Sequence, residues 1–172
     1  DKEKLTQYRW ASNNSILADI GMDYSWHAKQ IAQNGEPGIQ WLDNARAYGR
    51  MKDPMNWNDK EAVGCNPCSE QTLHNYELCT LVETFPARHA TLDEYIETLK
   101  IAYLYAKTVT LVPTHWEETN SVMARNRRIG LSQSGIIKAF GRHGRRTMLG
   151  WCDKGYEFIN GLDVQYSNWL GV

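Results

Sequence analysis

Asn66-Pro67-Cys68-Ser69-Glu70 is the stretch from which the fold and the chemistry of this 172-residue chain are inferred. Pro67 fixes its own φ and favours extended backbone at Asn66, so the segment is predicted to be an extended loop of defined shape. Side chains at alternate positions of extended backbone point to the same side. The amide of Asn66, the thiol of Cys68 and the carboxylate of Glu70 are therefore expected to share one face. There an amide can orient a hydroxyl, a carboxylate can take its proton, and a sulfur can do one-electron or nucleophilic chemistry.

A second cysteine lies nine residues after Glu70, in Leu78-Cys79-Thr80-Leu81-Val82-Glu83. Such a thiol can supply an electron or close a disulfide during a redox reaction. Taken together with the first stretch, Cys79 indicates a reaction centre whose residue types suit chemistry on a sugar hydroxyl.

The cysteines also permit three other interpretations. Cys65 and Cys68 form a C-x-x-C pair, the spacing of half a zinc site or of a thioredoxin-like redox pair. A zinc site normally needs a second pair at similar spacing, and Cys79 and Cys152 are far apart in the sequence. A thioredoxin-like pair should lie between a strand and a helix N-terminus, whereas these cysteines follow the polar run 56–61. Buried structural thiols are the third interpretation, which explains neither the neighbouring amide nor the carboxylate.

Composition narrows the setting of the chain. Hydrophobic residues make up 42% of it and aromatic residues 11%, which is typical of a globular protein that can bury a core. A net charge of -1 argues against a general nucleic-acid or membrane-surface binder, which would carry a basic excess. No apolar run approaches the roughly 18 to 20 residues of a membrane helix, and residues 1–4 are not typical of a signal peptide. Four unevenly spaced cysteines do not form a secreted disulfide framework, so reduced thiols in the cytoplasm are predicted.

Helical and extended patterns alternate along the chain and predict an α/β fold. A helix starts at the capping box Thr91-Leu92-Asp93-Glu94 and runs to Ala106, and its aromatic residues are predicted to lie in the core. Leu78–Phe85 is predicted to be a strand buried on both faces. The other expected elements are the end of a helix over 1–8, a loop entering a strand over 9–17, a helix over 23–33 capped by Asp23 and stopped by Asn34-Gly35, a turn over 36–38, a strand over 38–43, a loop over 44–59, a helix over 116–126, a strand and turn over 129–135, and a helix over 156–169 interrupted by Gly161.

Three further stretches bear on the family of the chain: Arg9-Trp10-Ala11-Ser12-Asn13-Asn14-Ser15, Asn34-Gly35-Glu36-Pro37-Gly38-Ile39 and Asn126-Arg127-Arg128-Ile129-Gly130-Leu131-Ser132-Gln133-Ser134-Gly135. In their order and approximate intervals, these stretches and 66–70 resemble ribonucleotide reductases. The chain is most similar to the adenosylcobalamin-dependent class II enzymes, especially the monomeric ribonucleoside-triphosphate reductases, over essentially its whole length. The asparagine-x-cysteine-x-glutamate element is shared with the class I large subunit. The anaerobic glycyl-radical class usually lacks the glutamate and the reducing cysteines.

The resemblance implies part of the family's ten-stranded α/β barrel, with Cys68 at the tip of a finger loop inside it. Cys68 would carry a thiyl radical that abstracts the ribose 3′-hydrogen, Glu70 would accept the 3′-hydroxyl proton, and Asn66 would hydrogen-bond the sugar hydroxyls while water leaves C2′. Cys79 matches one member of the cysteine pair that delivers reducing equivalents. Asn13 and Asn14 are expected to face the nucleotide, with a turn-forming pair of asparagines as the alternative.

By the same resemblance, residues 1–172 form one partial barrel: the end of the first half-barrel, the finger loop and the start of the second half-barrel. The N-terminal strands, the substrate-specificity loop, the phosphate-binding segment and the C-terminal relay cysteines of the family would be absent. The chain is therefore expected to be inactive alone. It would need the remaining segments of the barrel, a ribonucleotide substrate, adenosylcobalamin and a thioredoxin-like reductant, and the partner of Cys79 would lie outside it.

Three functions remain open from the sequence. The first is the catalytic segment of a cobalamin-dependent reductase that converts ribonucleoside triphosphates to 2′-deoxyribonucleotides. The second is a noncatalytic interaction or assembly module derived from the reductase core, and the third is a fragment of a class I large subunit. The intact set of Asn66, Cys68, Glu70 and Cys79 favours catalysis, because a protein released from catalysis has no physical need for that combination.

Several conspicuous residues receive no functional assignment. The five histidines have no metal-ligand spacing, so no protein-bound metal is predicted. The arginines within 125–128 and 142–146 are more typical of a solvated face than of a phosphate site. No role is assigned to Cys65.

Overall fold

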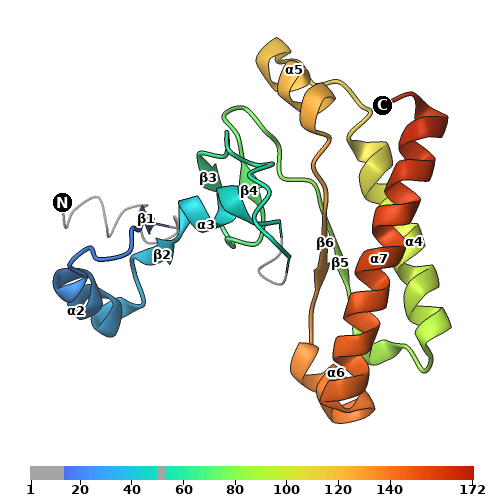
Figure 1. Ribbon diagram of the computed structural model, residues 1–172, viewed down its shortest axis with the longest axis horizontal. Coiled ribbons are helices and arrows are strands. Elements are labelled where there is room, and N and C mark those ends of the chain that lie inside the picture. The colour runs from blue at the N-terminus through green and yellow to red at the C-terminus, as the bar shows by residue number, and fades with distance from the viewer. Residues whose placement is uncertain (1–13, 50–52) are drawn as a thin grey trace. The chain divides into compact units, whose positions relative to one another are not determined.

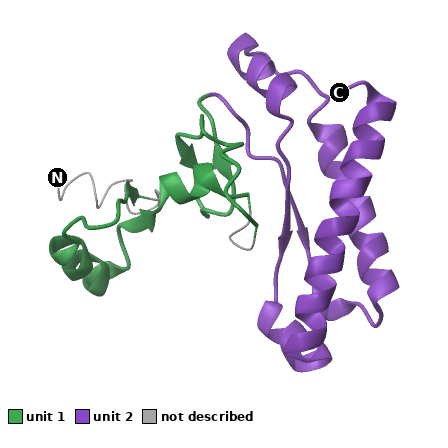
Figure 2. Ribbon diagram, viewed as in Figure 1, with its two compact units in different colours: residues 1–75 green, residues 76–172 purple. Residues whose placement is uncertain are grey.

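The computed structural model describes residues 14–49 and 53–172 (Figure 1). The chain divides into two compact units, residues 1–75 and residues 76–172 (Figure 2). The expected helix end over 1–8, the start of the loop over 9–17, and Asn13 lie outside the described residues.

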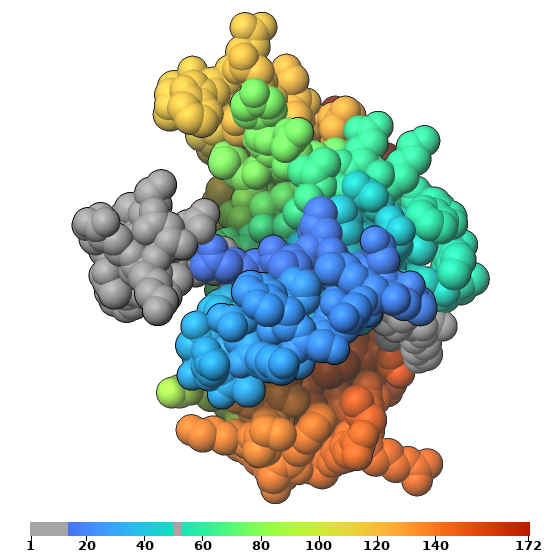
Figure 3. All heavy atoms as spheres, turned by 90° about the vertical axis from the view of Figure 1, so that its left-hand side faces the viewer, coloured from blue at the N-terminus to red at the C-terminus, as the bar shows by residue number. Residues whose placement is uncertain are grey.

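The first unit begins with a β-α-β arrangement. Strands β1 (Ser15–Leu17) and β2 (Gly38–Gln40) are parallel, and helix α2 (Ser25–Asn34) connects them. Helix α2 has no buried residue, and its atoms, in blue, form part of the surface that faces the viewer in Figure 3. Gly38 lies opposite Ser15, where a Cβ would come within 2.7 Å of the serine Oγ, so a larger residue at position 38 would require the Ser15 side chain to rotate.

The ends of helix α2 follow the predicted signals. Gly35 adopts the left-handed conformation at φ 81° and donates its N–H to the carbonyl of Ile31, which ends the helix as predicted. Asp23 accepts a hydrogen bond from the backbone N–H of Ser25 at 2.9 Å, although Tyr24 is the residue at the cap position. No residue of this helix is fully buried, although His27, Gln30 and Ile31 are partly buried.

The prediction of a strand over 38–43 followed by a loop over 44–59 is wrong in part. Strand β2 ends at Gln40, and helix α3 occupies Leu42–Ala47. Leu42 and Ala47 are both buried, and Asp43 in the first turn pairs with Arg46 at 3.3 Å. The short amphipathic segment forms a helix because it buries its two ends, a tertiary effect that local polarity conceals.

The first unit ends in a hairpin. Strands β3 (Gly64–Cys65) and β4 (Thr72–Leu73) are antiparallel and pair Cys65 with Thr72. Each strand has two residues, so the backbone ladder contributes little by itself.

The second unit is a β-α-β arrangement with two further helices. Strands β5 (Leu81–Thr84) and β6 (Gly130–Gln133) are parallel, and between them lie the 3-10 helix η2 (Pro86–Arg88), helix α4 (Leu92–Val109) and helix α5 (Glu117–Asn126). Helices α6 (Ile136–His143) and α7 (Arg145–Leu170) follow. In Figure 1, α4 and α7 lie side by side next to the strands, in agreement with the contacts between them. This alternation confirms the predicted α/β fold.

The core of the second unit lies where α4 and α7 meet. Its buried residues are Tyr95, Leu99, Ala139, Met148 and Trp151. The rings of Tyr95 and Trp151 stack with centroids 5.6 Å apart, and Tyr103 is also fully buried. The prediction that the aromatic residues of this helix are core residues is therefore confirmed for Tyr95 and Tyr103.

The predicted capping box is present at the start of α4. Glu94 donates its backbone N–H to Thr91 Oγ1 at 3.2 Å, and its carboxylate accepts from the N–H of Ala90 at 2.6 Å. These two bonds satisfy donors that the helix leaves open at its first turn.

Two predicted elements in this unit need correction, and one helix was missed. Strand β5 is shorter than 78–85 and is not buried on both faces, because Glu83 is exposed. Helix α6 was not expected. Helix α7 has 26 residues and is continuous through Gly161, where a break was predicted. Buried Leu162 and the contacts of Asp163 with α4 hold this part of α7, and tertiary packing offsets the roughly 1 kcal/mol cost of the glycine.

Candidate active site

The predicted reactive stretch forms the turn of the β3–β4 hairpin. The backbone N–H of Asn66 donates to the carbonyl of Gln71 at 3.0 Å, and the N–H of Ser69 donates to the carbonyl of Asn66 at 3.0 Å. Ser69 has a φ of 63°, in the left-handed region. A left-handed residue reverses the chain direction, so the prediction of an extended loop whose alternate side chains share one face is wrong. Hydrogen bonds across a tight turn, and not an extended backbone, fix the arrangement of Asn66, Cys68 and Glu70.

Asn66 closes this turn with its side chain. Its Oδ1 accepts the backbone N–H of Gln71 at 3.0 Å, and the residue is only 4% exposed. Asparagine commonly bonds to nearby backbone in this way, so this structural role was accessible from the sequence. Cys68 and Glu70, in contrast, are exposed. The turn therefore exposes the Cys68 thiol and the Glu70 carboxylate to solvent, while Asn66 fixes the backbone where the turn closes.

Gln71 is a site residue that the sequence did not reveal. It is 5% exposed, and within the described residues neither atom of its side-chain amide has a hydrogen-bond partner. Because Asn66 and Gln71 are the residues next to the last ladder pair, their side chains lie on the same face of the hairpin. The segment that carries the exposed Cys68 thus contains two buried side-chain amides, those of Asn66 and Gln71. Only the amide of Asn66 was predicted to belong to the site.

The other face of the hairpin is bound to the segment that precedes it. Thr72 Oγ1 donates to Asp59 Oδ2 at 2.6 Å, and His74 Nε2 lies 3.0 Å from Asp59 Oδ1. The second ring nitrogen of His74 lies 3.6 Å from Glu61 Oε2. Asp59 is 18% exposed and His74 11%, so solvent screens these interactions only in part.

Cys79 belongs to the second unit, where it is exposed and lies two residues before β5. The neighbouring Glu77 has a fully buried carboxylate, whose Oε1 accepts from Arg128 Nε at 3.1 Å and from Asn126 Nδ2 at 2.9 Å. The N–H of Gly130 donates to the carbonyl of Thr80 at 2.8 Å. The backbone on both sides of the thiol is thereby fixed to the start of β6.

Three arginines that received no functional assignment from the sequence make hydrogen bonds or ion pairs within the second unit. Arg128 pairs with Glu77, Arg127 donates to the carbonyl of Thr110 at 2.8 Å, and Arg142 donates to the carbonyl of Ala87 at 2.7 Å. These contacts give the three side chains a structural role that the sequence left open.

Cys152 differs from the other cysteines. It lies on α7, where its Sγ is 3.8 Å from Gln133 Oε1, and Gln133 Nε2 donates to the Tyr95 hydroxyl at 2.7 Å. Burial is the main reason that the pKa of the Cys152 thiol is raised, and burial also raises the pKa of Tyr95. Cys152 therefore stays protonated at neutral pH and is a poor nucleophile.

Asn14, the other predicted substrate residue that the structure describes, is partly buried. Its carbonyl accepts the N–H of Gly38 at 2.7 Å, so its backbone continues the pairing of β1 with β2. Its side chain helps to line a cavity of about 280 Å³ together with Trp26 and His27.

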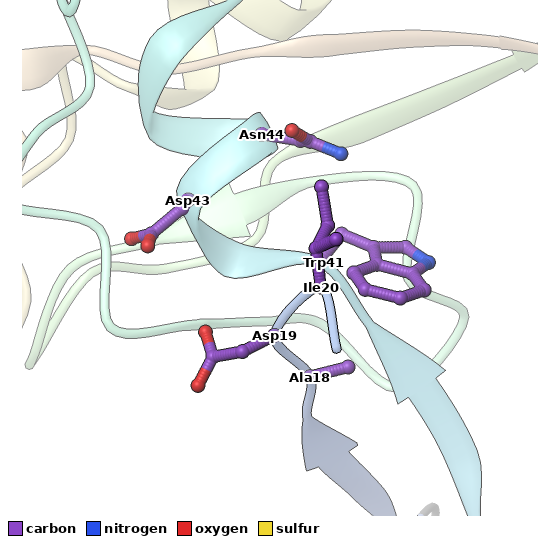
Figure 4. A pocket seen from close by; sticks show the side chains of 6 residues that line it. All are labelled: Ala18, Asp19, Ile20, Trp41, Asp43 and Asn44. Carbon is purple, nitrogen blue, oxygen red and sulfur yellow. The ribbon is translucent and has the colours of Figure 1, made fainter. Parts of the chain in front are cut away.

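A second cavity, of about 190 Å³, lies between the end of β1 and the start of α3. Figure 4 shows the carboxylates of Asp19 and Asp43 on one side of it and the indole of Trp41 on the other. None of the predicted site residues that the structure describes lines this cavity.

In residues 14–49 and 53–172, no group of three or more His, Cys, Asp or Glu side chains is arranged to hold a metal ion. No helix in the part of the chain that the structure describes is both long and apolar enough to span a bilayer.

Comparison with known proteins gives matches over nearly the whole chain. No family model matches. A probable adenosylcobalamin-dependent ribonucleoside-triphosphate reductase of Dictyostelium discoideum is 52% identical over 166 residues, which cover 96% of this chain and 22% of that protein. The adenosylcobalamin-dependent ribonucleoside-triphosphate reductase of Euglena gracilis is 49% identical over 96% of this chain and 23% of its own length. A crystal structure of a B12-dependent class II ribonucleotide reductase matches 99% of this chain and 28% of its own, with a TM-score of 0.86 and 34% identity.

The match in fold and sequence therefore places this chain as a stretch of a class II ribonucleotide reductase. This confirms the predicted α/β fold as part of the reductase barrel. More narrowly, the chain is similar over most of its length to a stretch of adenosylcobalamin-dependent ribonucleoside-triphosphate reductases. It spans about 22% of the length of the first curated relatives that it matches.

Proposed function

We propose that this chain supplies the radical cysteine, the general base and one reducing cysteine of an adenosylcobalamin-dependent ribonucleoside-triphosphate reductase. The observation that carries the proposal is the hairpin turn, in which buried Asn66 holds exposed Cys68 and Glu70 within a few residues of each other. A radical carrier and a base must both reach one ribose, and a closed turn offers them together.

Each residue of the turn has a distinct task in the proposed reaction. The Cys68 thiyl radical takes the hydrogen atom from C3′ of the ribose, and the Glu70 carboxylate accepts the proton of the 3′-hydroxyl. Asn66 Oδ1 is already bound to Gln71 N–H, so its Nδ2 is the group that donates to a sugar hydroxyl. The 2′-hydroxyl then leaves as water, and Cys68 finally returns a hydrogen atom to C3′.

Cys79 provides half of the reducing equivalents. With a second cysteine outside this chain it gives up two electrons and two protons and becomes a disulfide, so that a ribonucleotide and two thiols yield a deoxyribonucleotide, water and a disulfide. Cys79 is exposed on a segment anchored by Glu77, which suits a thiol that must meet a partner. A thioredoxin-like protein would reduce the disulfide again, in a cytoplasmic setting where thiols are kept reduced.

The exposure of the Cys68 thiol is the property of this chain that fits an adenosylcobalamin cofactor. When bound, adenosylcobalamin would supply the one-electron oxidation of the Cys68 thiol. Cys68 is exposed at the tip of its turn, as a thiol must be to face an external oxidant. The finger-loop placement of this turn inside a barrel is part of the proposal, as are the remaining barrel segments and the nucleotide contacts of Asn13 and Asn14.

A chimera tests the proposal directly. In the Euglena gracilis reductase, the region that this chain matches is replaced by the chain's own 166 residues. The chimera is expected to reduce ribonucleoside triphosphates with adenosylcobalamin and a dithiol, and Cys68→Ser is expected to abolish this activity, because a hydroxyl cannot replace a thiol as a radical carrier. Cys65→Ser, in the same hairpin, is the matched control and should keep most of the activity.

Three outcomes would contradict the proposal. An inactive chimera that is folded and binds nucleotide would favour the noncatalytic assembly module. Substantial turnover by the Cys68→Ser variant would remove Cys68 from the chemistry. A requirement for an iron or manganese radical subunit in place of adenosylcobalamin would assign the chain to class I.

A further inference from the structure

The hairpin that carries the proposed reactive turn has a weak backbone ladder. Strands β3 and β4 have two residues each, and a short two-stranded hairpin is at best marginally stable alone. A turn that must hold a radical carrier within a fraction of an ångström needs further support. That support must come from side chains outside the turn.

Asp59 provides such support from thirteen residues before Thr72 and fifteen before His74. Thr72 and His74 are alternate residues, so their side chains leave the hairpin on the same face. The two carboxylate oxygens of Asp59 bind one each, Oδ2 at 2.6 Å from Thr72 Oγ1 and Oδ1 at 3.0 Å from His74 Nε2. A bridging carboxylate fixes direction as well as distance, and its charge strengthens both hydrogen bonds.

The segment around Asp59 is itself fixed. The carbonyl of Asp59 accepts the N–H of Ala62 at 2.9 Å, and the carbonyl of Ala62 accepts from Arg46 Nε at 2.8 Å. Arg46 belongs to helix α3. Asp59 therefore connects β4 to a helix of the same unit, whereas Asn66 only connects the turn to itself.

We propose that Asp59 is a positioning residue for the reactive turn, acting through Thr72 and His74. This inference rests on the proposed function and extends it. Thr72 follows Glu70 after a single residue, so a displacement of β4 is transmitted to the base and, across the turn, to Cys68. Without the Asp59 hydrogen bonds the turn would still form, but it would sample orientations in which the thiol and the carboxylate miss the ribose.

A matched pair of variants at Thr72 isolates the hydrogen bond. Thr72→Val keeps the shape and removes the hydroxyl, while Thr72→Ser keeps the hydroxyl. In the chimera, Thr72→Val is expected to lower kcat by about 10- to 100-fold with KM changed less than about 3-fold, the signature of misplaced catalytic groups. Thr72→Ser should restore kcat to within about 3-fold of the parent, and Asp59→Ala, which removes both acceptor oxygens, should lower kcat at least as much as Thr72→Val.

Hydrogen exchange on the 172-residue chain gives a second readout that does not depend on activity. The backbone N–H groups of Asn66 and Gln71 close the turn, and both are expected to exchange faster in Thr72→Val than in the parent, while Thr72→Ser should match the parent.

The outcomes separate the two proposals. An inactive parent chimera would contradict the proposed function, while the exchange data would still decide whether Asp59 holds the hairpin. Unchanged kcat and unchanged exchange in Thr72→Val would overturn the positioning role. Equal losses of kcat in the Ser and Val variants would also overturn it, because the effect would then come from packing and not from the hydroxyl.

Discussion

Ser69 shows how one backbone angle changes the interpretation of the whole reactive stretch. The residue types of Asn66, Cys68 and Glu70 could be read from the sequence, and so could the chemistry that they suit. Their arrangement could not, because it depends on the left-handed φ of 63° at Ser69, a conformation that a serine adopts only when the surrounding hydrogen bonds require it. The predicted shared face assumed extension, and the structure replaces it with a turn that Asn66 closes.

The carboxylate of Glu70 is expected to act as the base. In the active chimera, Glu70→Gln keeps the size of the side chain and one hydrogen-bond acceptor but cannot take a proton at neutral pH. Turnover should fall by about 10² to 10⁴-fold, as when a general base is removed, with little change in folding. Glu97→Gln, at an exposed position on α4, is the control and should leave turnover unchanged. Normal turnover by Glu70→Gln, measured where chemistry limits the rate, would exclude Glu70 as the base.

Cys79 is expected to form a disulfide with a cysteine outside this chain. The raised pKa of the partly buried Cys152 makes that thiol a poor candidate for the partner. Peptide mapping by mass spectrometry after one turnover without reductant should find Cys79 oxidised and Cys152 reduced. A Cys79 that remains reduced, or that is joined to Cys65 or Cys152, would remove it from the proposed reducing pair.

At the scale of the element, capping signals were more informative than apolar patterns. The capping box at Thr91–Glu94 and the helix end at Gly35 were predicted correctly, because helix caps depend on residues that are close in the sequence. Helix α3 and the continuity of α7 through Gly161 were missed because distant contacts decide them. The contacts of Asp59 with the hairpin and of Glu77 with the segment before β6 were missed for the same reason, since their partners are 13 to 51 residues away.

Two glycines on α7 offer a matched test of the packing between α4 and α7. A Cβ at Gly155 would lie 2.7 Å from Leu99 Cδ1 and 3.0 Å from Tyr95 Cε1, whereas a Cβ at Gly161 would meet nothing within 4 Å. Gly155→Ala is therefore expected to lower the free energy of unfolding by about 1 to 3 kcal/mol. Gly161→Ala should raise it by about 0.5 to 1 kcal/mol. Urea denaturation followed by circular dichroism measures both, and equal effects at the two sites would contradict the close packing.

At the scale of the whole molecule, exposed apolar surface is the main feature that composition did not disclose. Ile20 is 91% exposed, Ile137 80% and Trp169 67%. Each sheet in the described ranges has only two strands, so strand edges are left without a neighbour in those sheets. A soluble globular composition predicted a core but could not show how much apolar surface would remain uncovered.

The chain by itself is expected to be inactive and to associate. Reduction of a ribonucleotide requires water to be excluded from the radical, and the proposed thiol is exposed in this chain. Light scattering after size-exclusion chromatography should show self-association, and assays with adenosylcobalamin and a dithiol should show no product. Addition of the complementary parts of the reductase should reduce the self-association. A monodisperse monomer that produces deoxynucleotides unaided would contradict both expectations.

Lys107 allows two parallel helices to end next to each other. Tyr95 of α4 stacks on Trp151 of α7, and Lys107 Nζ, further along α4, donates to Asp163 Oδ1 at 3.1 Å and Ser167 Oγ at 2.8 Å, so the two helices run in the same direction. Their C-terminal carbonyl groups carry partial negative charges of the same sign, and these repel. The ammonium group of Lys107, which is only 5% exposed, lies between the two last turns and offsets that repulsion.

Lys107→Met tests this electrostatic role, because it removes the charge and keeps most of the aliphatic chain. The free energy of unfolding should fall by about 1 to 2 kcal/mol. Since the ammonium group is buried, added salt should screen it poorly, and the loss should be similar in about 0.1 M and about 1 M sodium chloride. A loss that disappears at high salt would contradict this role, because salt screens strongly only a charge that is in contact with solvent. A loss that persists at high salt would show that this buried charge stabilises the contact between α4 and α7, in addition to the stacking of Tyr95 on Trp151.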